Sequence, residues 1–150
     1  LYTDNNMSFE FLDVNSKSQK MYIQDENGTI TAGTASPLTD GAAATLVCEE
    51  EYAKANKLPI IARIKSIAVQ GCPPELMGLG PINASKKALK RANLDINDID
   101  IVELNEAFAL QVLYCREKLG IDDNLLNVNW DAISIGQLYG VSGSRMLLMH

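Results

Sequence analysis

The alternation of strand and helix candidates in the second half of the sequence constrains its fold more than any other feature. A strand candidate at residues 60–69 precedes a helix candidate at 84–92. A second strand candidate at 101–104 leads into a helix candidate at 106–119, which we expect to end at Gly120 because glycine suits the C′ position. Strands and helices that alternate at this spacing predict an α/β layered fold.

Local signals elsewhere are less decisive. Asn83 is a candidate N-cap for the helix at 84–92, since an asparagine side chain can accept a hydrogen bond from a free helical N–H. Propensity predicts a helix for the apolar run 42–48, continuing into residues 49–54. An uninterrupted apolar run of this length is equally typical of a fully buried strand. Residues 1–26 are polar and aperiodic, which indicates loop or edge structure.

The composition excludes some classes of protein. The sequence is 47% apolar, as soluble globular proteins are, and no apolar run approaches the roughly 18 residues of a membrane span. The net charge of −6 argues against a nucleic-acid partner, because binding to phosphates requires clustered basic residues. The one basic cluster is interpreted as the solvent-exposed face of a helix; it comprises Lys86, Lys87, Lys90 and Arg91.

The cysteines and the chain ends give two further expectations. Cys48, Cys72 and Cys115 form no CxxC pair, so neither a metal site nor a disulfide framework is predicted, and a reducing intracellular compartment is the default. We expect Cys48 and Cys115 to be buried core residues. The sequence starts at Leu1 without a methionine and its final apolar run has no stop signal, so we expect a fragment.

A polar pair follows the strand candidate at 101–104, in the run Asn105-Glu106-Ala107-Phe108-Ala109. Open α/β sheets bind ligands at the carboxyl ends of their strands, which makes this run a candidate binding site. The simpler interpretation is a helix start, with Asn105 as the N-cap and Glu106 complementing the helix dipole.

Together with three other motifs, this run resembles the thiolase family. The lead-in Asp98–Leu104 and the run Asn105–Ala109 are similar to the family's NEAF motif, and Met77-Gly78-Leu79-Gly80-Pro81 is similar to its MG-x-GP loop. Gly28–Ser36 with Asp40–Ala44 resembles its GT(V/I)TAGNAS…DGAAA stretch. Asn127–Asn129 and Gly140–Arg145 resemble parts of its NVNGGAIALGHPxGASGAR block. The resemblance covers residues 27–150, while residues 1–26 match poorly.

The resemblance implies a thiolase-type layered α/β fold, with mixed five-stranded sheets covered by helices, that is incomplete in this chain. Residues 27–58 would end the N-terminal domain, with 42–48 as a buried strand, and residues 59–150 would form the first part of the C-terminal domain. Oligomeric assembly, or association with the remainder of a thiolase, is implied as well. A chain exposing uncovered sheet edges is expected to aggregate or to need a partner.

The resemblance also implies an activity. Thiolases make or cleave a carbon–carbon bond between acyl-CoA units through an acyl-cysteine, with coenzyme A as a substrate and no separate cofactor or metal. Asn105 matches the asparagine that holds a water in an oxyanion pocket, and Ser36 matches a serine beside the pantetheine arm. Met77 and Phe108 match apolar residues near the acyl and pantetheine channel, although ordinary core packing explains them equally well.

The sequence departs from the family where the chemistry is most demanding. Gln137 stands where the family has the histidine that activates the nucleophile, and an amide cannot take up and return a proton. Losing a positioned base costs about 10²–10⁴-fold in rate. Trp130 and Asp131 replace two glycines, so we expect a crowded or charged cleft and a rearranged loop. Leu138 replaces a proline and Pro37 a glycine, which leaves the local backbone open to change.

The three cysteines match neither of the family's two reactive cysteines, which we expect before Leu1 and after His150, and the basic residues that bind the CoA nucleotide are expected upstream as well. We therefore expect weak CoA binding, no catalysis by this chain alone, and no rescue by Gln137→His. Two hypotheses follow. The chain is a portion of an acyl-CoA C-acyltransferase, or it is a degenerate non-catalytic module that binds acyl-CoA or a thiolase partner.

Overall fold

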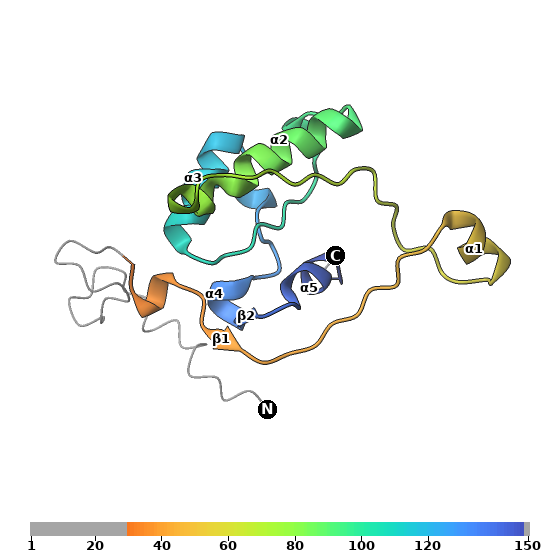
Figure 1. The fold of residues 1–150 in the computed structure, drawn as a ribbon, viewed down its shortest axis with the longest axis horizontal. Coiled ribbons are helices and arrows are strands. Elements are labelled where there is room, and N and C mark those ends of the chain that lie inside the picture. Colours follow the sequence, from red (N-terminus) through yellow and green to blue (C-terminus); the bar gives the residue numbers. More distant parts are fainter. Residues whose placement is uncertain (1–29, 149–150) are drawn as a thin grey trace.

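The computed structural model describes residues 30–148, so the interpretations of residues 1–26, of the turn at Asn27-Gly28 and of His150 lie outside the described part. Two groups of elements lie one above the other (Figure 1). The helices α2 (Gly80–Ala92) and α3 (Ala109–Leu119) form one group. The second group contains a short parallel strand pair and two short helices. It comprises β1 (Leu38–Thr39), β2 (Gln137–Leu138), α4 (Ala132–Ile135) and α5 (Ser142–Leu148).

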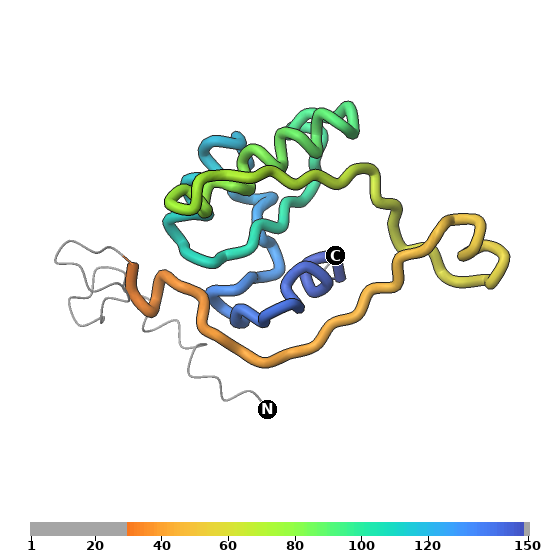
Figure 2. Tube along the Cα trace, in the orientation of Figure 1, coloured from red at the N-terminus to blue at the C-terminus, as the bar shows by residue number. Residues whose placement is uncertain are grey.

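The remaining elements are short. Helix α1 (Glu50–Ala55) stands apart at the tip of a long excursion of the chain, which Figure 2 shows as two stretched segments running out and back. Between residues 30 and 148, the connections contain four 3-10 helices: η2 (Ala32–Thr34), η3 (Pro74–Leu79), η4 (Ile96–Asp98) and η5 (Asp123–Leu125). Two isolated bridges add to the β1–β2 pair, an antiparallel one between Ala35 and Phe108 and a parallel one between Val102 and Leu126.

The core lies between α2 and α3. Six buried side chains form it: Ile82, Leu104, Val112, Cys115, Leu119 and Ile121. Four partly buried side chains, Leu79, Ile96, Val102 and Leu126, pack against them. The core therefore joins α3 to Ile82 in the first turn of α2.

The prediction of the first helix is right in its end and wrong in its start. Helix α2 begins at Gly80, so Asn83 is an interior residue and not an N-cap. Pro81 occupies the first turn, where its fixed φ suits a helix and its missing N–H costs nothing. Beyond the end of the helix at Ala92, Asn93 takes a left-handed conformation with φ of 55°.

The second helix, in contrast, begins later than predicted. Helix α3 starts at Ala109 with the extended residue Phe108 before it, because the bridge to Ala35 holds residue 108 in a strand conformation. Asn105 is therefore not the N-cap of this helix. The predicted end is confirmed, since Gly120 follows the helix with a φ of 73°.

The strand predictions are mostly wrong for the described residues. Residues 42–48 form neither the predicted strand nor the alternative helix, and residues 60–69 pair with no strand; both lie exposed. Of the strand predicted at 101–104, the structure has only the bridge at Val102. A strand needs a hydrogen-bonded neighbour, and the described residues provide none for residues 42–48 and 60–69. Cys48 is exposed with its segment, contrary to the prediction of burial.

Hydrogen bonds to α2 hold the segment 60–69 in place of a ladder. Lys87 Nζ donates to the carbonyl of Val69 at 3.0 Å, Arg91 donates to the carbonyl of Ile67, and Ser66 Oγ donates to the carbonyl of Ala88 at 2.8 Å. The basic cluster of α2 is thus only partly a free solvent-exposed face, because two of its four members anchor this segment.

Candidate functional site

Residues 35–38 join the two regions that carry the sequence motifs. Ser36 donates from its N–H and its Oγ to the carbonyl of Ala107, at 3.1 and 3.3 Å. The N–H of Gln137 donates to the carbonyl of Pro37 at 2.8 Å, and Leu38 pairs with Gln137 in the parallel strands. We call residues 35–38, 105–108 and 137–142 the motif junction.

Asn105 lies in the non-helical approach to α3, within the motif junction. Its amide Oδ1 is buried and has no hydrogen-bond donor among the described residues. A buried acceptor without a donor costs about 1–3 kcal/mol, so natural structures retain such groups mainly at sites with a special role. The residue therefore remains a candidate for binding, while the capping interpretation is wrong.

Gln137 is held in a fixed orientation by its neighbours. Its Nε2 donates to Ser142 Oγ at 3.1 Å, and Ser142 Oγ donates to the carbonyl of Leu138 at 3.3 Å. Because the serine proton is directed to Leu138, the glutamine must donate to the serine with its NH₂ group, which places Oε1 on the other side. This Oε1 is buried and has no donor among the described residues. Gln137 has hydrogen-bonding capacity but no proton to exchange near neutral pH.

Pro37 and Leu138 stand where the family has a glycine and a proline, and both fit the junction without disrupting it. The carbonyl of Pro37 accepts the strand hydrogen bond, and Leu138 pairs with Thr39. Leu138 packs so closely over Gly41 that a Cβ on this glycine would overlap the leucine side chain. Gly136 has a φ of 103° and would likewise clash with Thr39 if it carried a Cβ. The parallel pair β1–β2 therefore depends on two glycines.

Trp130 and Asp131 stand where the family has two glycines, and their side chains lie in opposite environments. Trp130 has a left-handed φ of 71° and is 57% exposed, so its indole does not fill the interior. Asp131 is completely buried and is paired with Arg145 of α5. Its second carboxylate oxygen accepts a hydrogen bond from the N–H of Glu106 at 2.6 Å. The negative charge is thus neutralised inside the protein and does not charge an open cleft.

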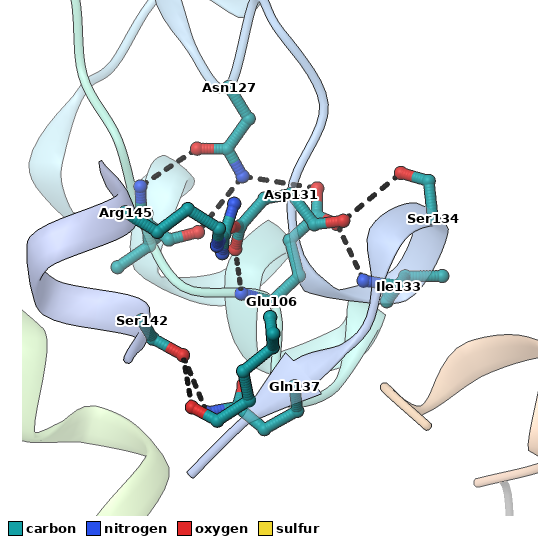
Figure 3. A network of polar contacts seen from close by, with 10 residues as sticks. Glu106, Asn127, Asp131, Ile133, Ser134, Gln137, Ser142 and Arg145 are labelled. Carbon is teal, nitrogen blue, oxygen red and sulfur yellow. Dashed lines mark hydrogen bonds and ion pairs between the residues drawn. The ribbon is translucent and has the colours of Figure 1, made fainter. Parts of the chain in front are cut away.

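Glu106 and Asn127 continue this network (Figure 3). Glu106 accepts from Asn127 Nδ2 at 3.0 Å and from the N–H of Ile133 in the first turn of α4 at 3.2 Å. Asn127, with a φ of 48°, pairs through its amide with both backbone groups of Leu104, at 2.8 and 2.9 Å. Glu106 therefore complements the start of α4 and not, as predicted, that of α3. This network is not predicted from the sequence, where its only local signal is the cluster of polar residues at 127–131.

The apolar candidates and the buried cysteine lie in different environments. Met77 belongs to η3 and is 69% exposed, which excludes core packing for it; Phe108 is half-buried. Cys115 is buried, as predicted, and its thiol donates to the carbonyl of Gly78 at 3.3 Å. Burial raises the pKa of the Cys115 thiol, and the hydrogen bond from Gln111 offsets part of that rise. A buried neutral thiol is a poor nucleophile.

Two cavities lie among the described residues, and the larger of the two is lined in part by Glu106 of the motif junction. A cavity of about 160 Å³ lies between Ile96, Val102, Ile121 and Leu125, and one of about 300 Å³ lies between α3 and the start of α4, lined by Val112, Leu113, Ile133 and the polar Glu106 and Asn127. Within residues 30–148, no cluster of three metal-ligating side chains occurs and no helix is long and apolar enough to cross a membrane.

Comparison with known proteins shows two family matches. Residues 58–150 match the thiolase C-terminal domain, and residues 10–51 match the thiolase N-terminal domain. Among curated relatives, the 3-ketoacyl-CoA thiolases of Shewanella loihica and Vibrio cholerae are 56% and 54% identical over 123 residues, which is 80% of this chain and 32% of each relative.

Solved structures give the same result. The crystal structure of human mitochondrial 3-ketoacyl-CoA thiolase superposes with a TM-score of 0.84 at 41% identity, over 88% of this chain and 33% of that one. The dimeric peroxisomal thiolase of Saccharomyces cerevisiae superposes with a TM-score of 0.83 at 42% identity, over 87% and 33%. The chain spans about a third of the length of these proteins. Its fold is accordingly the predicted α/β fold of thiolase type, present in part.

Proposed function

The chain belongs to the thiolase family, and on that premise we propose that it is a portion of an acyl-CoA C-acyltransferase acting on 3-ketoacyl-CoA. In this proposal the chain contributes part of the surface that binds the acyl-CoA and does not catalyse alone. Residues 27–58 would belong to the N-terminal domain of the enzyme and residues 59–150 to the C-terminal domain. Coenzyme A would be a substrate, with no further cofactor.

The observation that carries the proposal is the motif junction. Three separate parts of the sequence, which contain Ser36, Asn105 and Gln137, are joined there by backbone hydrogen bonds across up to 100 positions of the chain. Such a meeting of polar groups, placed by rigid backbone pairing, supports a binding role. The buried acceptor oxygens of Asn105 and Gln137 further support contact with a ligand or an ordered water.

The proposed division of roles follows from the chemistry of each side chain. Asn105 would orient a water or the thioester carbonyl, and Ser36 would lie beside the pantetheine arm with Met77 and Phe108 lining the apolar part. Acyl transfer also needs a thiolate and a base. Gln137 cannot serve as the base, and Cys115 is buried and neutral, which supports the expectation that the chain alone is inactive.

The proposed partners are acyl-CoA and further protein of the thiolase family, as a second copy or as the remainder of a thiolase. One relative of known structure is described as dimeric, and another was solved in complex with CoA. An intracellular location is part of the same proposal. The strong similarity to enzymes named 3-ketoacyl-CoA thiolases favours this function over a degenerate binding module.

Thermal unfolding in the presence of CoA tests the binding role. A ligand that binds only the folded state raises the unfolding temperature, and the rise grows with its concentration. We expect a rise with millimolar CoA or acetyl-CoA, a smaller rise for Asn105→Ala, and an unchanged rise for Gln70→Ala, which removes an exposed amide outside the motif junction. If the parent chain shows no rise at millimolar CoA, the binding proposal is wrong.

Restoring the histidine tests the proposed lack of catalysis. We expect the chain with Gln137→His to show no thiolysis of acetoacetyl-CoA, because a base without a reactive thiolate completes no acyl transfer. Chromatography measures the release of acetyl-CoA directly. Turnover by this variant in isolation would show that the described chain contains a nucleophile we have not identified.

A further inference from the structure

We propose that Asp131, held by Arg145, is a positioning residue that fixes the backbone around Asn105 and couples it to the helix that carries the partner of Gln137. The proposal rests on the proposed function, in which Asn105 is a binding amide. It assigns a role to a carboxylate that occupies a position where the family has glycine.

Asn105 is flanked on both sides by backbone groups that bind side chains. Before it, Leu104 gives its N–H and its carbonyl to the amide of Asn127. After it, the N–H of Glu106 donates to Asp131. Two residues on, the carbonyl of Ala107 accepts from Ser36. Since Asn105 Oδ1 has no donor among the described residues, its position depends on these neighbouring bonds.

Asp131 uses both of its oxygens in this arrangement. Oδ2 accepts the N–H of Glu106 at 2.6 Å, and Oδ1 pairs with the guanidinium of Arg145 (Figure 3). A glycine at this position could offer no side-chain acceptor to residue 106. A fully buried carboxylate is strongly unfavourable without a paired cation, so Asp131 can hold this position only because Arg145 accompanies it.

Arg145 connects Asp131 to the part of the candidate site that contains Gln137. It lies on α5, three residues after Ser142, whose hydroxyl receives the hydrogen bond of Gln137. The ion pair therefore ties the loop of Asn105 to the helix that orients Gln137. The two residues of the candidate site are linked through one buried pair.

A purely structural ion pair would give a different result from a positioning pair, and a set of variants separates them. Arg145→Met leaves an unpaired buried carboxylate and is expected to destabilise the chain. Asp131→Gly with Arg145→Met removes both charges, so it should recover much of the lost stability but not the acceptor for Glu106. Asp131→Asn with Arg145→Met retains an uncharged acceptor. The matched control is the exposed pair Arg116–Asp123, replaced by Met and Gly.

The measurement is the NMR spectrum of the full chain. For the Asp131→Gly, Arg145→Met double variant we expect a displaced Asn105 side-chain resonance and about tenfold faster hydrogen exchange at the Glu106 amide. For the Asp131→Asn, Arg145→Met double variant we expect both signals to return toward the parent values. The Arg116–Asp123 control should leave both unchanged. A Gly/Met variant that is folded with parent-like Asn105 and Glu106 signals would overturn the proposal. If Arg145→Met does not fold, the comparison of the two double variants still decides.

CoA binding by the same variants gives a second measurement. We expect affinity to fall about tenfold for the Gly/Met variant and to recover in the Asn/Met variant, as is typical when a supporting hydrogen bond is lost. Loss without recovery would contradict the proposed role of the acceptor. If the parent chain does not bind CoA, the proposed function fails, while the NMR signals still decide whether Asp131 positions Asn105.

Discussion

At the scale of single residues, two neighbours show how one backbone conformation separates two environments. Trp130 adopts a left-handed φ of 71°, which directs an exposed indole outward and lets Asp131 enter the interior. A bulky residue in this conformation is strained, by about 1–2 kcal/mol relative to the right-handed region. The burial of Asp131 is stabilised by its pair with Arg145 and by its hydrogen bond from Glu106.

Trp130→Gly is expected to stabilise the folded chain, because glycine adopts a positive φ without strain. Part of the gain is offset by the greater freedom of glycine in the unfolded chain, so we expect a net increase of about 0.5–1 kcal/mol in the free energy of unfolding. Urea unfolding followed by circular dichroism measures it. Tyr139→Gly is the matched control: it removes an aromatic residue that is 80% exposed and lacks a positive φ. A Trp130 variant no more stable than this control would rule out the strain.

The three cysteines are expected to differ in reactivity. Burial raises the pKa of Cys115, so the folded chain keeps this thiol protonated, whereas Cys48 and Cys72 are exposed. Mass spectrometry after brief treatment with iodoacetamide near pH 8 should show alkylation of Cys48 and Cys72 and none of Cys115. Cys115 modified as fast as the other two would contradict its burial.

The same pKa gives a direction for the stability of the chain with pH. An acid whose pKa is raised on folding stabilises the folded state below its unfolded pKa and loses that contribution as the pH rises through its folded pKa. The contribution of Cys115 should therefore decline as the pH rises from the ordinary thiol pKa toward the raised pKa of the folded state. Cys115→Ser should show less of this alkaline decline in urea unfolding than the parent chain, and an equal decline would contradict the assignment.

At the scale of elements, the strand pair β1–β2 shows what a short ladder requires. Two residues from each strand pair in parallel, joining segments about 100 positions apart. The pairing is close enough that Gly41 lies against Leu138 and Gly136 against Thr39. In each case the glycine backbone lies against a side chain of the other segment, in space that a Cβ on the glycine would occupy.

Gly136→Ala is expected to open this strand pair. The new Cβ would overlap Thr39, and alanine would also be strained at a φ of 103°, so we expect a loss of more than about 2 kcal/mol in the free energy of unfolding. Gly143→Ala is the matched control, because a Cβ there meets nothing and lies within helix α5. It should be neutral or slightly stabilising. Equal effects of the two substitutions in urea unfolding would contradict the close approach.

Helix α3 is the element whose sequence most clearly anticipates further contacts. One face packs against α2 through Val112, Cys115 and Leu119, yet Leu110 and Leu113 on its other faces are exposed. A helix that is apolar on several faces is typical of a helix covered on all sides. We therefore expect Leu110 and Leu113 to lie on a surface that further protein can cover.

At the scale of the whole molecule, the two segments flanking α1 carry many of the exposed apolar side chains. They expose large apolar side chains without strand partners among the described residues; these include Leu46, Val47, Ile61, Ile67 and Val69. Exposed apolar residues on unpaired extended backbone favour association with other chains. This agrees with a chain that spans a third of the length of its relatives.

Ile61→Lys is expected to reduce concentration-dependent self-association, because it places a charge on a segment where the isoleucine is 83% exposed. Sedimentation velocity over a range of concentrations measures it. Gln70→Lys adds the same charge nearby without removing an apolar side chain and should have a smaller effect. An equal reduction by both substitutions would indicate general charge repulsion and not the apolar segment.

The sequence by itself determined the features that depend on residues close together in the chain. The end of α3 at Gly120, the burial of Cys115 and the family to which the motifs belong are all readable from local patterns. These signals act within a few residues, through backbone conformation, periodicity and fixed motif spacing.

Only the tertiary structure decided the features that depend on distant partners. Helix α3 starts at Ala109 and not at Glu106 because Ala35, 73 positions before Phe108, bridges that residue. Residues 42–48 and 60–69 have strand-like sequences but no ladder, since a ladder needs a neighbour that their own sequence cannot supply. Asp131 is buried, and is not a surface charge, because Arg145 of α5 pairs with it. No sequence pattern around residue 131 predicts that contact.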